Sequence, residues 1–254
     1  MLSEINPHPR DANITFKEEN HEYTVIGMKN RPTSVTTLIH KYFPEFNPDE
    51  VITKMMKSRG WPNSKYYGRT RESIKEEWEK NGAEASALGT VMHQSIEDFL
   101  NGDHNFPDTK EFSMFLTFWN GLLTQYPTLK PYRTEWLVYD EDVGVAGSID
   151  CVLTDGNDNL VIIDWKRSKE IKMSNSYEKG QYPFNLCDNC NYVHYTLQLN
   201  FYRHMLETKY NKNVIFMMLV ILHPNQEGAE YHPISKVEVS QLWPKLNTDE
   251  FTKH

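Results

Sequence analysis

The pattern of apolar and polar positions predicts mostly helices in the first half of the chain. A helix is expected from about Ser34, where a hydroxyl cap precedes apolar residues at helical spacing. Another should begin at Asn47-Pro48-Asp49-Glu50, which supplies a cap, a proline at the first helical position and two acids at the positive end of the dipole. Further helices are expected over about 69–80, 83–100 and 112–123. Before all of them, residues 14–28 form two β-prone runs around a polar turn and predict a hairpin.

Strand patterns dominate the second half of the chain. Runs of β-branched and aromatic residues predict strands over 134–139, 145–153, 160–166 and 214–222. A helix over about 195–209 is expected before the last strand, and a long insertion, 167–192, precedes that helix. This order predicts an α/β fold, with a central mixed β-sheet flanked by helices and a helical N-terminal portion. We expect one domain over residues 1–254, in which residues 1–82 form the hairpin and helical portion and residues 83–254 the sheet-bearing core.

The composition narrows the class of protein. The 254 residues include 27 basic and 35 acidic side chains, a net charge of −8 that by itself argues against a nucleic-acid partner. The longest apolar run, 214–222, is about half the length that a bilayer requires. The N-terminus resembles neither a secretory signal nor a transit peptide, and the three cysteines are too few for a secreted disulfide framework. We therefore expect a soluble intracellular protein with no membrane partner, cytoplasmic or, if encoded by a virus or phage, acting in the host cell.

Basic charge is concentrated in one segment. Residues 54–71, the basic segment, contain six basic residues and no acidic residue, with aromatic side chains among them. Cations and stacking rings are what a surface for single-stranded nucleic acid needs. The alternative is a solvated positive loop that balances an acidic protein. The residues of this segment expected to contact DNA are Lys54, Lys57, Arg59, Trp61, Lys65, Tyr66, Arg69 and Arg71.

Two of the predicted strands bring acidic residues together. The turn signal centred on Asn157 predicts an antiparallel hairpin, and a symmetric register places Asp150 opposite Asp164. Lys166 lies two residues after Asp164 and so shares its face of the strand. Two close carboxylates hold a divalent metal, which lowers the pKa of a bound water and offsets phosphodiester charge in the transition state. The alternative is a cross-strand ion group with no catalytic role.

Two helical pairs add to this group. His93 and Glu97 share one face of a predicted helix, as do Gln198 and Tyr202 of a later one. Taken singly, each has an ordinary interpretation: a structural histidine for His93, and a surface pair for Gln198 and Tyr202. Because one pair precedes the acidic hairpin in the sequence and the other follows it, each pair is a candidate to contribute to the same site as the two aspartates.

The ordered set resembles the motifs of the PD-(D/E)xK nuclease superfamily, in particular its RecB-like exonuclease branch. The matching residues are Gly89 with His93, Gly147 with Asp150, Asp164 with Lys166, and Gln198 with Tyr202, over nearly half of the chain. The helical region before His93 is also similar to that of the mitochondrial genome maintenance exonuclease and its phage and viral relatives. The resemblance implies a restriction-endonuclease-like core and a metal-dependent nuclease activity.

The resemblance also implies a role for each matching position. Mg²⁺ or Mn²⁺ would be held by His93, Asp150, Asp164 and the backbone carbonyl of Trp165. Lys166 would act with the two aspartates in catalysis, by positioning the attacking water. Contacts with the DNA backbone would come from Gln198 and Tyr202, and the basic segment would line a passage for single-stranded DNA. Supporting candidates, for a second metal or for hydrogen bonds, are Glu97 and Glu135.

The cysteines separate this chain from the iron–sulfur members of the branch. Those relatives hold a cluster with four cysteines, whereas Cys151, Cys187 and Cys190 do not stand in the corresponding places. An iron–sulfur cluster is therefore not expected. Cys187 and Cys190 have the spacing of zinc ligands, with His194 four residues on, and His204 or His223 as a possible fourth ligand. A structural zinc is the less favoured interpretation, and two ordinary thiols the favoured one.

The function expected from the sequence is a metal-dependent DNA exonuclease that prefers single-stranded ends. It would serve DNA replication, recombination or repair, with a helicase or another replication or recombination protein as a partner. One alternative is a structure-selective endonuclease with the same metal site. Another is a non-catalytic DNA-binding subunit of the same fold, against which the presence of every expected ligand and of Lys166 argues.

Overall fold

The computed structural model describes residues 1–103 and 105–239. The helices are α1 (Leu2–Ile5), α2 (Val35–His40), α3 (Pro48–Lys57), α4 (Arg71–Leu100), α5 (Lys110–Gln125) and α6 (Asn191–Lys209). The strands are β1 (Ile14–Lys17), β2 (Glu22–Val25), β3 (Thr33–Ser34), β4 (Lys130–Asp140), β5 (Val145–Thr154), β6 (Asn159–Lys166), β7 (Asn213–Ile221) and β8 (Glu230–Pro233). No helix in the described part of the chain is long and apolar enough to cross a membrane.

The central sheet is mixed, as the sequence predicts. Its strands run in the order β3-β5-β6-β7-β8, and β4 pairs with β5 in addition. The β5–β6 hairpin is antiparallel, whereas β6 and β7 are parallel because α6 forms the crossover between them. The β1–β2 hairpin is a separate antiparallel pair, and its predicted position is confirmed.

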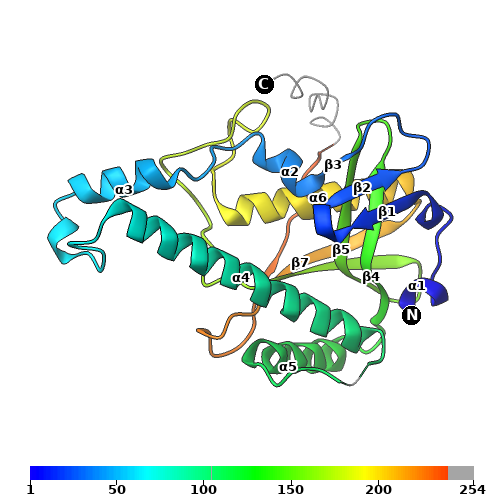
Figure 1. The fold of residues 1–254 in the computed structure, drawn as a ribbon. Helices are drawn as coiled ribbons and strands as arrows, with labels where there is room; N and C mark the ends of the chain where they lie inside the picture. Colours follow the sequence, from blue (N-terminus) through cyan, green and yellow to red (C-terminus); the bar gives the residue numbers. More distant parts are fainter. Residues whose placement is uncertain (104, 240–254) are drawn as a thin grey trace. The chain divides into compact units, whose positions relative to one another are not determined.

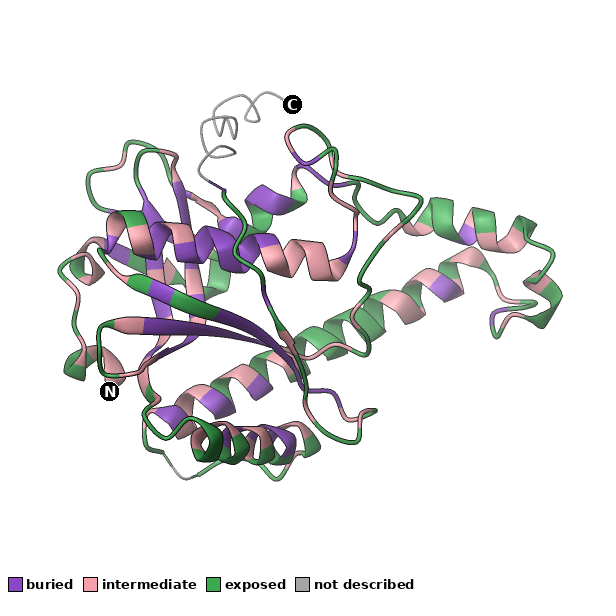
Figure 2. Cartoon of the chain, turned by 180° about the vertical axis from the view of Figure 1, so that it is seen from behind, coloured by how far each residue is buried: buried purple, intermediate pink, exposed green. Residues whose placement is uncertain are grey.

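Helices cover both faces of this sheet (Figure 1). Alternate residues of β6 enter two different apolar clusters: Ile162 packs on the side of α2 and α6, whereas Ile163 packs on the side of α5 and the end of α4. This period of two is what strands buried on both faces require. Figure 2 shows the sheet strands as the largest buried part of the fold. The predicted α/β fold with helices flanking a central sheet is therefore confirmed.

The chain divides into two compact units. One consists of residues 1–44 and 92–239 of the described chain and contains the whole sheet; the other, residues 45–91, is helical. The helical unit has its own small core, Ile52, Tyr66 and Ile74. Within α3, Asn47 caps the helix by accepting from the backbone N–H groups of Asp49 and Glu50, as its sequence predicts.

One helix prediction needs correction. The segments 69–80 and 83–100, expected as separate helices, form the single helix α4. Gly82 lies between these segments, but a glycine inside a helix costs only about 1 kcal/mol, so helical hydrogen bonding continues through it. The short strands β3 and β8 are absent from the sequence prediction, because two to four residues are too few to establish an alternating pattern.

Candidate active site

The β5–β6 hairpin has the register that places the two aspartates opposite each other. Cys151 pairs with Ile163 and Thr154 with Leu160, and the same register puts Asp150 opposite Asp164 one position beyond the last pair. There the two strands separate, since β6 continues along β7 only, while β5 continues along β4. The aspartates therefore lie where the sheet forks.

Asp150 is fixed in this fork by the opposite strand. The backbone N–H of Trp165 donates to Asp150 Oδ2 at 2.9 Å. Burial and the nearby charge of Asp164 raise the pKa of Asp150 to about 7, although His93 and Lys166 act in the opposite direction. Such a carboxyl gains from a cation, because a cation removes the cost of burying its charge.

His93 and Glu135 complete a trio with Asp150. His93 Nδ1 lies 3.5 Å from Asp150 Oδ2 and 3.9 Å from Glu135 Oε1. Ligand atoms from all three residues lie within 4.8 Å of one another, and no other such group of His, Cys, Asp or Glu occurs in residues 1–103 and 105–239. The trio therefore differs from the predicted ligand set, since it contains Glu135, expected only as a supporting residue, and lacks Asp164.

Glu135 joins the trio through an irregular strand backbone. Its φ is +42°, in the left-handed region that non-glycine residues rarely adopt. The β4–β5 register places Glu135 opposite Asp150, between the pairs Thr134–Cys151 and Trp136–Ile149. Strained backbone of this kind costs about 1–3 kcal/mol and is concentrated at functional sites. No pattern in the sequence signals it, because φ at a single strand position follows from the folded sheet.

The charges of the trio favour a bound cation or proton. Burial lowers the pKa of His93, but Asp150 and Glu135 outweigh it, so the net pKa of His93 is raised. Burial also raises the pKa of Glu135, yet the neighbouring His93 and a hydrogen bond from Ser148 Oγ, 2.6 Å to Oε2, lower it overall. Two carboxylates thus face one imidazole at distances too long for good hydrogen bonds.

Asp164 and Lys166 lie together beside the trio. Lys166 Nζ is 2.6 Å from Asp164 Oδ2, and Asp164 is only 2% exposed. The other oxygen, Oδ1, is buried and has no hydrogen-bond partner within the described residues. Burial lowers the pKa of Lys166, but Asp164 and Asp150 outweigh it and raise the pKa overall. Lys166 Nζ also lies 5.1 Å from the centre of the Tyr195 ring, so a cation–π contact restrains it.

The donor set fits a divalent metal with oxygen and nitrogen ligands. Around Mg²⁺, with bonds of about 2.0–2.1 Å, ligand atoms are separated by up to about 4.2 Å. The measured 3.5 Å and 3.9 Å from His93 to the two carboxylates lie within that limit. Asp164 Oδ1 is buried without a hydrogen-bond partner, whereas Oδ2 pairs with Lys166, so Oδ1 is the atom that a metal or its water would satisfy.

Gln198 and Tyr202 lie in the interior of the sheet-bearing unit. They are 7% and 4% exposed, and Gln198 Nε2 donates to Tyr202 Oη at 3.3 Å. A Cβ added to Gly147 would lie 2.5 Å from Tyr202 Cε1, so the glycine makes room for the ring. The tyrosine and the glycine of two separate motifs are therefore in contact, and the structure gives Tyr202 a packing role. DNA contact by Gln198 and Tyr202 stays a prediction.

The comparison with protein families identifies the chain at this point. A model described as "PD-(D/E)XK nuclease superfamily" matches residues 108–250, more than half of the chain. The chain belongs to the PD-(D/E)XK nuclease superfamily. The matched region contains Asp150, Asp164 and Lys166 but begins after His93. Nucleases of this superfamily use divalent metals, and the trio of His93, Glu135 and Asp150 could hold one here.

Other comparisons give more distant likenesses. No curated protein matches this nuclease significantly. Among the solved structures that match, one described as "Crystal structure of SSO0001" has 14% sequence identity and a TM-score of 0.37. That match covers 84% of this chain and 71% of that chain.

The basic segment lies in the helical unit, and part of its charge is neutralised there. Arg69 pairs with Glu77, Lys65 Nζ is 3.6 Å from Glu77, and Lys54 Nζ is 3.9 Å from Glu50. These acids stand outside residues 54–71, so the sequence window does not show them. Tyr66 is buried and accepts a hydrogen bond from Trp78 Nε1 at 2.8 Å.

Other members of the basic segment remain open to solvent. Arg71 donates to Thr53 Oγ1 at 2.8 Å. The side chains of Lys57 and Arg59 are exposed and form no hydrogen bond or ion pair with other described residues. Trp61 is half-buried, with its ring centre 5.9 Å from that of Tyr67, which is exposed. Lys57, Arg59 and this aromatic pair are therefore available to a ligand.

The cysteines are free thiols. Cys151 and Cys190 are buried and Cys187 is half-buried. In the described residues, Cys187 and Cys190 do not belong to any group of three or more close metal-ligand side chains. His194 packs against Phe43, with ring centres 4.4 Å apart, and burial and His40 lower its pKa to about 4.

Proposed function

We propose that this nuclease is a divalent-metal-dependent deoxyribonuclease that degrades single-stranded DNA from its ends. The observation that carries the proposal is the fork of β5 and β6, where His93, Glu135 and Asp150 face one another beside Asp164 and Lys166. Mg²⁺ or Mn²⁺ would be held by His93, Asp150 and Glu135, with Asp164 and the carbonyl of Trp165 as further oxygen donors. A bound divalent metal supplies Lewis-acid stabilisation of phosphodiester charge and a more acidic water.

The chain's own residues would orient the reactants around that site. Lys166, held between Asp164 and the Tyr195 ring, can donate a hydrogen bond to an attacking water or to a phosphate oxygen. The Trp165 N–H fixes the Asp150 carboxylate, and the Ser148 hydroxyl fixes that of Glu135. Each acidic side chain thus has a second contact that holds it for binding, as precise catalysis requires.

The preference for single-stranded ends is supported by the basic segment. Lys57 and Arg59 provide unpaired cations, and Trp61 and Tyr67 provide rings on which bases can stack. The order of the motifs supports a place in the RecB-like branch, near the mitochondrial genome maintenance exonuclease and its phage and viral relatives. An enzyme of that kind would act inside the cell in replication, recombination or repair, beside a helicase or another such partner.

A time course on end-labelled linear and closed circular single-stranded DNA tests the proposal. Reactions contain Mg²⁺, Mn²⁺ or EDTA and compare wild type with Asp150→Asn and with Asp158→Asn, an exposed aspartate of the same hairpin. We expect metal-dependent loss of linear DNA alone. Asp150→Asn should lower the rate more than about 100-fold, because the metal contributes several kcal/mol and 1.4 kcal/mol is tenfold. Asp158→Asn should cleave as wild type does.

Two outcomes would redirect the proposal. Cleavage of circles as well as linear strands would identify a structure-selective or general endonuclease with the same site. Binding of DNA without metal-dependent cleavage of either substrate would leave a non-catalytic DNA-binding protein of this fold.

A further inference from the structure

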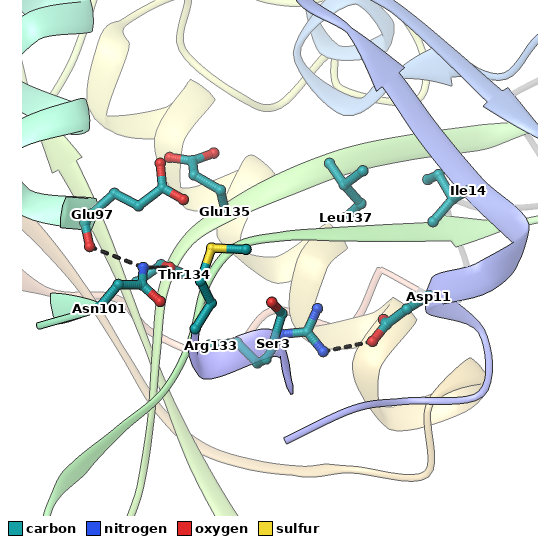
Figure 3. Close-up of a pocket in the computed structure, with 10 residues that line it drawn as sticks. Ser3, Asp11, Ile14, Glu97, Asn101, Arg133, Thr134, Glu135 and Leu137 are labelled. Atoms are coloured by element: carbon teal, nitrogen blue, oxygen red, sulfur yellow. Dashed lines mark hydrogen bonds and ion pairs between the residues drawn. The ribbon is translucent and has the colours of Figure 1, made fainter. Parts of the chain in front are cut away.

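A cavity opens beside the metal-binding trio, between the N-terminal segment and β4. Its volume is about 270 Å³, and Glu135 belongs both to its lining and to the trio. Glu97 and Glu135 lie toward one end, and Ile14 and Leu137 toward the other (Figure 3). The cavity lies wholly within the sheet-bearing unit.

The charged side chains of this cavity disfavour a phosphate group. The charged side chains of its lining are three carboxylates, Asp11, Glu97 and Glu135, and one guanidinium, Arg133, while the amino group of Met1 pairs with Glu4. That guanidinium already pairs with Asp11 at 2.7 Å. A group that enters must therefore be neutral or offer hydrogen-bond donors.

The remaining groups of the cavity suit a neutral ring with polar edges. Ile14 and Leu137 offer apolar surface, and the Glu97 carboxylate can accept from an amino group. Arg133 is 6% exposed and is held by Asp11 and by the Asn6 carbonyl, so it forms a fixed part of the cavity wall. Ser3 Oγ forms no hydrogen bond within the described chain.

We propose that this cavity binds the terminal nucleoside of the DNA strand, next to the phosphodiester at the metal site. The inference rests on the proposed deoxyribonuclease function and names the part of the substrate that the site would recognise. The volume lies just below the range of about 300–1,000 Å³ of pockets for drug-sized ligands, which suits one nucleoside rather than a dinucleotide. A pocket for a single terminal nucleoside makes an end, rather than an internal segment, the preferred substrate.

Binding of oligodeoxycytidylates to the Asp150→Asn protein tests this cavity without cleavage. Four strands of equal length are compared by fluorescence anisotropy in Ca²⁺: one intact, and one each with an abasic residue at the 5′ end, the 3′ end or the middle. Removal of one terminal base should weaken binding about tenfold, the scale of one stacked base. Removal of the middle base should have a smaller effect.

Variants of the cavity wall make the test specific. In the same background, Ser3→Leu should fill the cavity, so that removal of a terminal base weakens binding no more than removal of the middle base. Ser113→Leu, at an exposed serine of α5, is the matched control and should keep the terminal preference, that is, the greater effect of a terminal base. Leu137→Phe, a second filling variant from β4, should act as Ser3→Leu does, and thermal unfolding checks that each variant is folded.

The cavity proposal fails if a terminal base contributes no more than an internal one, or if both filling variants retain the terminal preference. Its failure is separable from failure of the nuclease proposal. If wild type cleaves DNA in a metal-dependent way, but a terminal base contributes no more to binding than an internal one, only the cavity proposal is wrong. If a terminal base contributes more to binding than an internal one, but wild type shows no metal-dependent cleavage, the nuclease proposal is wrong and the cavity is a binding site for DNA ends.

Discussion

The charged side chains that the β5–β6 hairpin brings to the site are largely buried, whereas many of those of the helical unit of residues 45–91 are exposed. In the hairpin, Asp164 is 2% exposed and pairs with Lys166 among apolar strands. In the helical unit, Lys57 and Arg59 are exposed and Lys65 pairs with Glu77 at the surface. A buried ion pair is costly to form, whereas surface ion pairs contribute about 0–1 kcal/mol. Charge in the hairpin therefore indicates function more strongly than charge in the helical unit.

The largest difference between the two regions should appear in stability. Lys166→Met leaves Asp164 buried without its cation and should lower the free energy of unfolding by about 3–5 kcal/mol. Lys57→Met, its control in the helical unit, should change it by less than about 0.5 kcal/mol. Urea denaturation in EDTA measures both. The double variant Asp164→Leu with Lys166→Met should recover part of the loss, and equal effects of the two single lysine changes would contradict the contrast.

The next effect tests how the hairpin is packed. Gly147→Ala places a Cβ 2.5 Å from Tyr202 Cε1 and should cost about 1–3 kcal/mol of unfolding free energy. In a Tyr202→Ala background the same change should cost less, because the ring has been removed. A double-mutant cycle by denaturation measures this coupling. Gly89→Ala is the control, since an added Cβ there meets no atom within 4 Å. Additive changes at Gly147 and Tyr202 would show that the two do not interact.

Metal binding at the hairpin should depend on pH. Asp150 has a pKa raised to about 7, so below that pH it carries a proton that a metal must displace. Mn²⁺ affinity should therefore rise as pH increases through about 7, where Asp150 loses its proton. Between pH 7 and pH 6 we expect up to about tenfold weaker binding per proton displaced, with His93, whose pKa is also raised, adding to it. Calorimetric titration measures this, and an affinity independent of pH from 6 to 8 would exclude proton displacement.

The smallest effect belongs to the helical unit. Replacing Lys57 and Arg59 together by alanine should reduce the salt dependence of single-stranded DNA binding. The slope of log K against log salt is negative, and it should become less negative by about 1.4 if both residues contact phosphates. Arg69→Ala, at a residue paired with Glu77, should change the slope less. Anisotropy titrations over a range of salt concentrations measure the slopes. An unchanged slope in the double variant would show that Lys57 and Arg59 of the basic segment do not contact DNA phosphates.

Much of the hairpin site could be predicted from the sequence. The register of β5 and β6 follows from one turn and from alternation of side chains, so Asp150, Asp164 and Lys166 were located by local rules. Glu135 was only a supporting candidate, because its place in the trio depends on a φ of +42° within β4. Long-range pairing sets that backbone, and no local pattern encodes it.

The helical unit was harder to predict for a related reason. Glu50 and Glu77 neutralise part of the basic segment from neighbouring helical turns that lie outside its sequence window. Tyr66, expected on the DNA-binding surface, is buried in the small core of this unit. Surface charge depends on which helices face one another, and a count of charges along the chain does not contain that information.

The most direct test of the metal site is Mn²⁺ binding measured by calorimetry at pH 8. It compares wild type with Glu135→Gln and with Glu97→Gln, a glutamate that lines the cavity but does not belong to the trio. We predict that Glu135→Gln weakens Mn²⁺ binding at least about tenfold, on the scale of a lost coordinating group, and that Glu97→Gln binds as wild type does. Wild-type affinity in Glu135→Gln would contradict the trio of His93, Glu135 and Asp150 as the metal site.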